Sequence, residues 1–99
     1  MDKIYKLPPY GSNQRSFYGK AIVVEENGVK FLQSYYTIVA AFDGKFHRLW
    51  GGWSATTSKH VNSFCCMLGL GSMPKAKWGK LPVERYESVR NAARLEVDF

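Results

Sequence analysis

The sequence predicts an α+β fold: a four-stranded antiparallel β-meander packed against one amphipathic helix, with a further C-terminal helix. Two observations carry this prediction. Short runs rich in β-branched and aromatic residues fill residues 17–50, and the turn dipeptides Asn27-Gly28 and Asp43-Gly44 interrupt them. After these runs, apolar residues recur at helical spacing, at Val61, Phe64, Cys65 and Leu68.

The first 16 residues are interpreted as a basic, irregular arm. Pro8-Pro9 bars a helix, and lysines precede it at positions 3 and 6. We expect the arm to pack over an edge of the sheet, although an arm that touches a polyanion is the functional alternative. Residues 17–99 then form a single α+β domain.

Four strands are expected at residues 17–25, 29–34, 37–42 and 45–50. Sequential antiparallel strands need only short connections, and the spacing of the two hairpin dipeptides provides them. The sequence therefore predicts a meander in which each strand pairs with the next.

The main helix is expected to begin near Thr56 or Thr57, whose hydroxyls can cap its first turn, and to end before Gly69. Pro82 predicts the start of the second helix, which runs to about Leu95. The predicted core contains Ile22, Val24, Leu32, Ile38, Ala40, Val61, Phe64, Cys65 and Leu68.

Charge and composition limit the class of partner. The net charge of +6 and the pI of about 9.5 favour a polyanion, either a nucleic acid or an acidic protein surface. The two adjacent cysteines, Cys65 and Cys66, are expected as free thiols in a reducing cytosol. We predict a cytoplasmic protein with no membrane partner, because no signal-peptide pattern or membrane-spanning apolar run is visible.

The start of the main helix is one candidate binding site. Thr56 and Thr57 lie beside the free N–H groups of the first turn, and Lys59 follows. A helix N-terminus attracts phosphate or carboxylate, so these residues can form an anion site. The plainer alternative is that the hydroxyls only cap the helix.

Basic residues interleaved with aromatic ones form the second candidate. The first group is Lys75, Lys77, Trp78 and Lys80, and the second is Lys45, His47, Arg48 and Trp50. Lysines contact phosphates and exposed rings stack on bases, whereas the alternative is a solvated charged face with its tryptophans in the core. For Trp50 the core is favoured, and for Trp78 both alternatives stay open.

Nothing in the sequence predicts a catalytic site, a metal site or a cofactor. Adjacent cysteines do not have zinc-site spacing, and His60 and Cys65 lie about 140° apart around a helix. Phosphate-binding glycine loops and hydrolase motifs are not found. The protein is therefore predicted not to be an enzyme.

Three segments in order, Ser16–Ala21, Ser34–Ala40 and Trp53–Val61, resemble a group of small phage and mobile-element proteins that carry a domain of unknown function. The resemblance covers roughly residues 16–68. It implies a compact β-meander-plus-helix domain in the cytoplasm of a bacterial host, and it assigns no catalytic residues.

These observations predict a small phage-type accessory protein that binds nucleic acid through a basic surface. Its binding residues would be Thr56, Thr57, Lys59, Lys75, Lys77, Trp78 and Lys80. The alternative is an inhibitor of a bacterial defence system, of the anti-CRISPR or anti-restriction type, that docks on a host protein or nucleoprotein through Tyr35, Tyr36 and Trp53. A homodimer formed through a sheet edge or through the second predicted helix is a third hypothesis.

Overall fold

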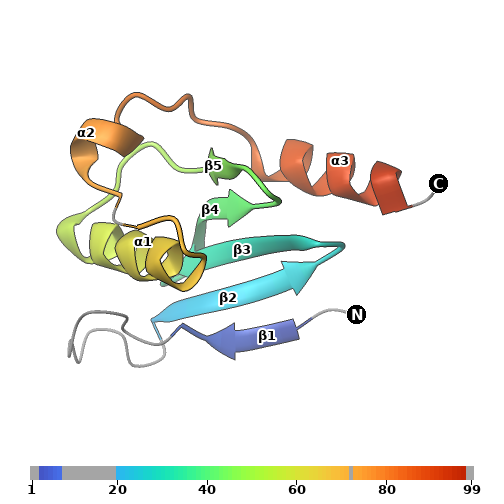
Figure 1. The fold of residues 1–99 in the computed structure, drawn as a ribbon, viewed down its shortest axis with the longest axis horizontal. Helices are drawn as coiled ribbons and strands as arrows, with labels where there is room; N and C mark the ends of the chain where they lie inside the picture. Colours follow the sequence, from blue (N-terminus) through green and yellow to red (C-terminus); the bar gives the residue numbers. More distant parts are fainter. Residues whose placement is uncertain (1–2, 8–19, 72, 98–99) are drawn as a thin grey trace.

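A computed structural model describes residues 3–7, 20–71 and 73–97 of the chain. It contains a five-stranded sheet in which the strands follow one another in sequence order and every neighbouring pair is antiparallel (Figure 1). The strands are β1 (Lys3–Lys6), β2 (Ala21–Glu26), β3 (Val29–Ser34), β4 (Thr37–Phe42) and β5 (Phe46–Arg48). The predicted α+β fold and meander are confirmed.

The first strand is a correction to the sequence prediction. The expectation of an irregular arm is wrong for residues 3–6, which form β1 and pair with β2. Tyr5 of β1 also donates a hydrogen bond from its hydroxyl to the sulfur of Met67 at 3.9 Å. Leu7, directly after β1, is buried in the core. Residues 1–2 and 8–16 of the predicted arm, and the predicted strand residues 17–19, lie outside the described residues.

Three tight turns connect the last four strands. Asn27 and Gly28 both have positive φ, of 52° and 81°, as the predicted hairpin turn requires. At the second predicted turn only Gly44 has positive φ, so the connection takes three residues and β5 starts at Phe46. The turn between β3 and β4 uses Tyr35 at a φ of 57°, an unusual conformation for a bulky residue.

A β-bulge in β4 changes which side chains face which side of the sheet. Leu32 pairs with Ala40 and Gln33 pairs with Ile38, so Val39 of β4 is the bulged residue and has no pairing partner on β3. Val39 and Ala40 consequently both belong to the same buried cluster. The bulge thus brings two consecutive residues of β4 under one helix.

The main helix, α1 (Ala55–Met67), is capped at both ends by short-range contacts. Its N-cap is Ser54, whose hydroxyl accepts a hydrogen bond from the Thr57 N–H at 3.1 Å, so the helix starts slightly earlier than expected. At the other end, Gly69 has a φ of 77° and the Leu70 N–H bonds to the Cys65 carbonyl, which is a Schellman arrangement. The predicted glycine terminus is confirmed.

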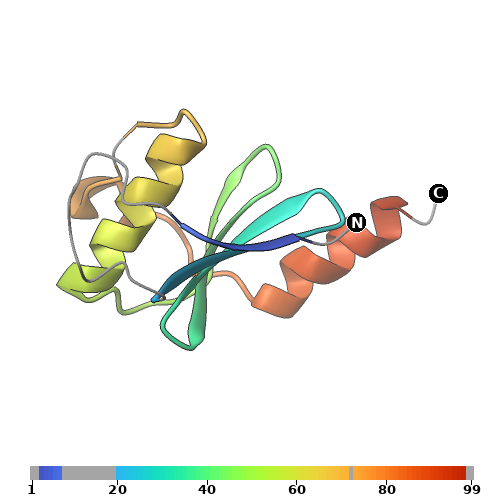
Figure 2. The ribbon, with the colours of Figure 1, turned by 90° about the horizontal axis from the view of Figure 1, so that it is seen from below.

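Helices lie on opposite sides of the sheet (Figures 1 and 2). One buried cluster joins the sheet to α1 and includes Leu32, Ala40, Val61, Phe64 and Cys65, as predicted. A second cluster joins the other side of the sheet to the C-terminal helix, α3 (Tyr86–Val97), and it contains Val29, Phe31, Ala41, Leu49, Val89 and Ala93. The predicted core residues Ile22, Val24, Ile38 and Leu68 are only half-buried.

The chain between the two large helices differs most from the prediction. A short helix, α2 (Lys75–Trp78), forms within the basic group of residues 75–80, for which no helix was predicted. Pro82 does not start a helix, because Val83 forms an isolated parallel bridge with Arg48 and α3 begins only at Tyr86. No helix in the described part of the chain is long and apolar enough to cross a lipid bilayer.

Candidate functional site

The hydroxyl of Thr57, in the first turn of α1, faces inward, toward the sheet. Thr57 is 8% exposed, and its Oγ1 hydrogen-bonds with the Ser34 hydroxyl at 3.0 Å. Ser34 also hydrogen-bonds with Nδ1 of the buried His60 at 2.8 Å. Thr57 therefore joins α1 to β3 and is not placed to contact an anion in solvent, which favours the capping alternative for this residue. Thr56 is half-buried.

Trp78 is buried, which favours the core alternative for this residue over base stacking. Its side chain is 7% exposed, and its ring centroid lies 4.7 Å from that of Trp53. Trp53 is 8% exposed and is likewise unavailable as the predicted aromatic anchor. The guanidinium carbon of Arg48 lies 4.8 Å from the Trp78 ring centroid, close enough for a cation–π interaction.

The second basic group of the sequence divides into buried and exposed parts. Arg48 is 9% exposed and donates hydrogen bonds to backbone carbonyls of Trp50, Gly51, Trp78 and Leu81. Trp50 is 50% exposed, so its predicted burial in the core is wrong. The backbone of Trp50 supports Arg48 while its ring lies at the surface.

Lys77 and Lys80 are exposed at a groove of about 350 Å³ that is otherwise apolar. We call it the lysine groove, and it is lined by Phe46, Met73, Ala76, Lys77, Lys80 and Leu81. No acidic residue lines it among the described residues. The structure therefore brings together two of the four predicted binding lysines. Lys59 is exposed on α1 but does not line the groove, and Lys75 lies at the start of α2.

A second groove, of about 560 Å³, lies where the β3–β4 turn, the end of β5 and the segment before α3 meet. We call it the aromatic groove. Tyr36, Trp50 and Val83 line it and are 98%, 50% and 53% exposed. Its charged lining residues are Glu84, Arg85 and Glu87. Large hydrophobic and aromatic side chains with such high exposure seldom cluster on the surface of a folded protein. Where they do, the cluster often marks a binding surface.

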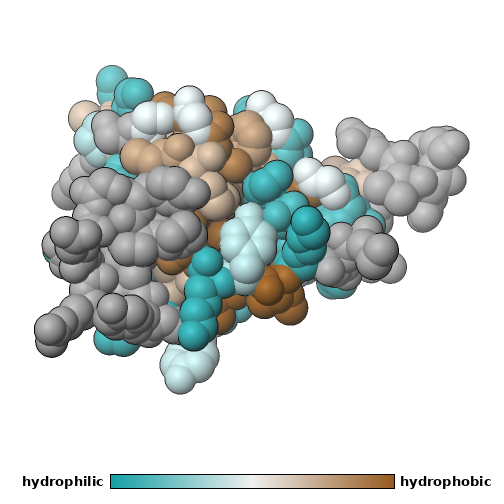
Figure 3. All heavy atoms as spheres, turned by 60° about the horizontal axis from the view of Figure 1, so that its bottom comes forward, coloured by the Kyte–Doolittle hydropathy of each residue, from teal (hydrophilic) through white to brown (hydrophobic). Residues whose placement is uncertain are grey.

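The opposite edge of the molecule, near β1, has a different surface. On the face shown in Figure 3, hydrophobic side chains of the described residues form small patches separated by hydrophilic ones. Ile4 of β1 is 73% exposed there. Scattered apolar residues are normal on protein surfaces, so the binding hypotheses depend on the two grooves beside β5.

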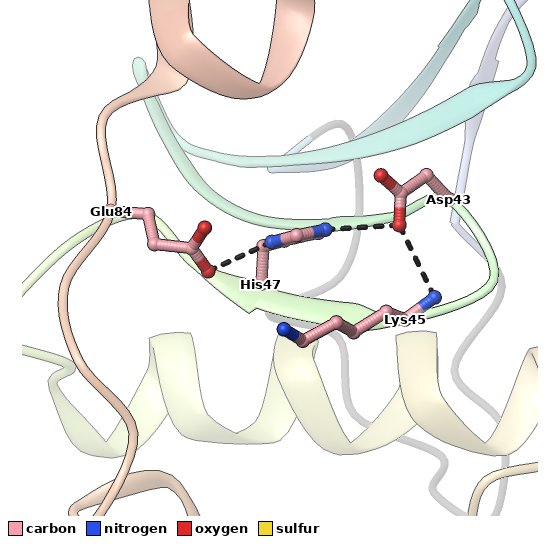
Figure 4. A network of polar contacts seen from close by, with 4 residues as sticks. All are labelled: Asp43, Lys45, His47 and Glu84. Carbon is pink, nitrogen blue, oxygen red and sulfur yellow. Dashed lines mark hydrogen bonds and ion pairs between the residues drawn. The ribbon is translucent and has the colours of Figure 1, made fainter. Parts of the chain in front are cut away.

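His47 lies between the carboxylates of Asp43 and Glu84, and this cluster was not predicted from the sequence (Figure 4). Its Nδ1 is 2.8 Å from Oε2 of Glu84, and its Nε2 is 2.9 Å from Oδ1 of Asp43. The same Asp43 oxygen accepts a hydrogen bond from the Lys45 backbone N–H at 3.2 Å. Both ring nitrogens of His47 are thus within hydrogen-bond distance of a carboxylate oxygen. This cluster ties the β4–β5 turn to the segment before α3.

The two cysteines have different environments. Burial, together with the smaller effect of the neighbouring Cys66, raises the pKa of the Cys65 thiol to about 12, while Lys77 opposes the shift. Cys66 is exposed, and both thiols are free. No group of three or more histidine, cysteine or acidic residues in the described ranges is arranged to hold a metal ion.

Comparison with known protein families matches residues 5–80 to a family of unknown function, DUF8033. The chain belongs to the DUF8033 family. The resemblance to a domain of unknown function is thus confirmed, and the match shows no phage or mobile-element origin. No curated protein and no solved structure matches the chain.

The family match covers most, but not all, of the two grooves. In this DUF8033 chain, Lys77 and Lys80 lie within the matched residues, as do Tyr36 and Trp50. Residues 83–87, which form one wall of the aromatic groove, and the helix α3 lie beyond the match. The lysine groove therefore belongs to the DUF8033 part of the chain except for Leu81.

Proposed function

We propose that this protein is a non-enzymatic binding protein that holds nucleic acid at the lysine groove. The observation that carries the proposal is the exposure of Lys77 and Lys80 at the rim of an apolar groove without an acidic lining residue among those described. Lysine ammonium groups bind phosphates, and the apolar floor accommodates sugars or base edges.

The arrangement of the acidic residues supports this proposal. Glu25 is paired with Lys30, Glu26 with Arg90, and both Asp43 and Glu84 with His47. These four carboxylates lie on β2, in the β4–β5 turn and in the segment before α3, and none of them lines the lysine groove. A net charge of +6 then favours association with a polyanion.

The two histidines support a binding role rather than catalysis. His60 is fully buried and hydrogen-bonded to Ser34, and His47 is held between two carboxylates. Neither ring faces an open groove with a nucleophile beside it. The resemblance to small phage and mobile-element proteins extends the proposal to an accessory protein in a bacterial cytoplasm.

The test is fluorescence anisotropy with a labelled oligonucleotide at low salt. The variant Lys77→Ala/Lys80→Ala should bind about tenfold more weakly than the wild type, because two phosphate contacts are lost. The matched control is Lys3→Ala/Lys6→Ala, which removes the same charge from exposed positions on β1 at the other edge of the sheet. Equal losses in both variants would show that charge alone, and not the groove, drives binding.

A second candidate is an inhibitor that docks on a host defence protein, and one observation favours it. Tyr35 adopts positive φ without being glycine, and its turn leaves Tyr36 98% exposed. Strained backbone beside exposed aromatic rings is more frequent at functional sites. A pull-down from nuclease-treated bacterial lysate would retain a stoichiometric protein partner that Tyr36→Ala loses. Without such a partner, this candidate is wrong.

A further inference from the structure

The aromatic groove has a composition that suits planar ligands. Tyr36 and Trp50 both line it and are 98% and 50% exposed, whereas the other two tryptophans are buried. A ligand can therefore contact these two rings without any rearrangement of the core. Nucleic-acid bases stack on exposed aromatic rings with little dependence on sequence, because every base has a π-face.

The two grooves are neighbours along one short segment. Leu81 lines the lysine groove and Val83 lines the aromatic groove, and the Cα atoms of residues two apart lie within about 7 Å. Phe46 packs against the cluster under α1, whereas Ile38 and Tyr86 pack against the cluster under α3. The grooves therefore lie on the two sides of the sheet, and residues 81–83 form the edge between them.

The charges at the aromatic groove permit a phosphate chain to enter. Arg85 lines the groove and is exposed, so it supplies a cation beside the rings. The opposing charges in the described lining are Glu84, which hydrogen-bonds with His47, and Glu87. Together with Lys77 and Lys80, the described linings of the two grooves contain three exposed cations and two carboxylates.

We propose that the ligand is a single-stranded nucleic acid whose bases stack on Trp50 and Tyr36 while its phosphates are held by Lys77 and Lys80. This inference rests on the proposed function and adds the form of the ligand. A single strand can bend over the edge at residues 81–83 and splay its bases, whereas a duplex is stiff over about 150 base pairs and keeps its bases stacked inside.

The first experiment compares a labelled single strand with its duplex in anisotropy titrations. Trp50→Leu/Tyr36→Leu keeps apolar side chains but removes the rings, and Trp50→Phe/Tyr36→Phe is the matched control that keeps them. We expect the leucine variant to lose about fivefold or more in affinity for the single strand per ring, and the phenylalanine variant to lose much less. Duplex affinity should stay within about twofold of the wild type in both variants.

The second experiment uses tryptophan fluorescence, because Trp50 is exposed while Trp53 and Trp78 are buried. Stacking of bases on Trp50 should quench the emission of the wild type on addition of the single strand. The variant Trp50→Phe should bind the strand with nearly the same affinity and lose most of the quenching. Quenching that survives in Trp50→Phe would overturn the assignment of Trp50 as the stacking residue.

The outcomes separate this inference from the proposed function. If the wild type binds nucleic acid in a salt-dependent way, but the leucine and phenylalanine variants bind single strands equally well, the stacking inference is wrong and the proposed function stands. If Lys77→Ala/Lys80→Ala binds every nucleic acid as tightly as the wild type does, both the inference and the proposed function are wrong. A protein partner captured through Trp50 and Tyr36, together with unchanged single-strand affinity in the leucine variant, would also overturn the inference.

Discussion

Arg48 donates hydrogen bonds to the carbonyl oxygens of Trp50 and Trp78, at 3.2 and 3.1 Å, and to two further carbonyls at Gly51 and Leu81. These carbonyls belong to the loop after β5, to α2 and to the segment that follows it. A buried guanidinium is stable only when its donors are satisfied, and five N–H groups in a plane make that feasible here. Arg48 therefore positions α2, and with it Lys77 at the lysine groove.

Replacement of Arg48 by lysine should destabilise the fold even though the charge is kept. A lysine ammonium is a compact group that cannot reach four separate carbonyls, so buried acceptors lose their partners. We expect Arg48→Lys to lower the free energy of unfolding by about 2 kcal/mol in urea denaturation. Arg85→Lys, at an exposed position, is the control and should stay within about 0.5 kcal/mol. Equal stability of the two variants would contradict the role of Arg48.

The cysteine pair gives a second prediction at this scale, because its two thiols differ in burial. Burial raises the pKa of Cys65 to about 12, so almost no thiolate exists there at pH 8, while Cys66 is exposed. A thiol reagent should modify one cysteine in the native protein and two after denaturation, and Cys66→Ser should abolish the native reaction. The folded pKa lies above the unfolded value of 9.0, so this thiol lowers stability only as pH rises from about 9 toward 12. Rapid native labelling of Cys65 would contradict its environment.

At the scale of elements, α1 depends on contacts that its own sequence supplies at both ends. Ser54 caps the first turn and Gly69 closes the last, while Val61 and Phe64 face the sheet. Ser34 reaches from β3 to Thr57 and His60 and fixes the helix on the sheet. The start of α1 is thus a structural junction rather than an open anion site.

Removal of the cap should therefore cost stability without affecting nucleic-acid binding. Ser54→Ala leaves the Thr57 N–H without its side-chain acceptor and should lower the free energy of unfolding by about 1 kcal/mol. Ser54→Asp keeps an acceptor and adds a charge that the helix dipole favours, so it should unfold like the wild type. If Ser54→Ala weakened binding strongly at unchanged stability, an anion site at α1 would have to be considered again.

The sequence predicted those elements whose residues carry local signals. Asn27-Gly28, the Gly69 terminus and the spacing of Val61 and Phe64 are properties of neighbouring residues, and each is confirmed. The four-residue β1 was missed because it gains its structure from pairing with β2 and not from its own composition. The predicted strand bounds leave Tyr35-Tyr36 as a connection, but its positive φ was not predicted because neither residue is a typical turn residue.

The candidate site was harder to predict because it depends on long-range contacts. The exposure of Trp50 and the burial of Trp78 both follow from the position of Arg48, which bonds to the backbone of each. Asp43, His47 and Glu84 meet only because the segment before α3 returns to β5. The hydrophobic pattern of the sequence does not indicate which of these residues contact one another in the fold.

At the scale of the whole molecule, the sheet has a helix on each side and the two binding grooves lie along its β5 edge. The helix α3 lies outside the part of the chain matched to the family, yet Val89 and Ala93 complete the second buried cluster. The paired carboxylates lie on β2, in the β4–β5 turn and in the segment before α3, whereas the lysine groove is on the side of α1. This separation of charges is what makes the protein a candidate polyanion binder.

The most direct test of that claim is the slope of log K against log salt concentration for a single strand, measured between about 50 and 200 mM salt. Each phosphate contact contributes about 0.7 to the slope, so Lys77→Ala/Lys80→Ala should flatten it by about 1.4 relative to the wild type, while Lys3→Ala/Lys6→Ala leaves it nearly unchanged. A wild-type affinity that does not change with salt, or a slope that the lysine-groove variant leaves intact, would contradict the account.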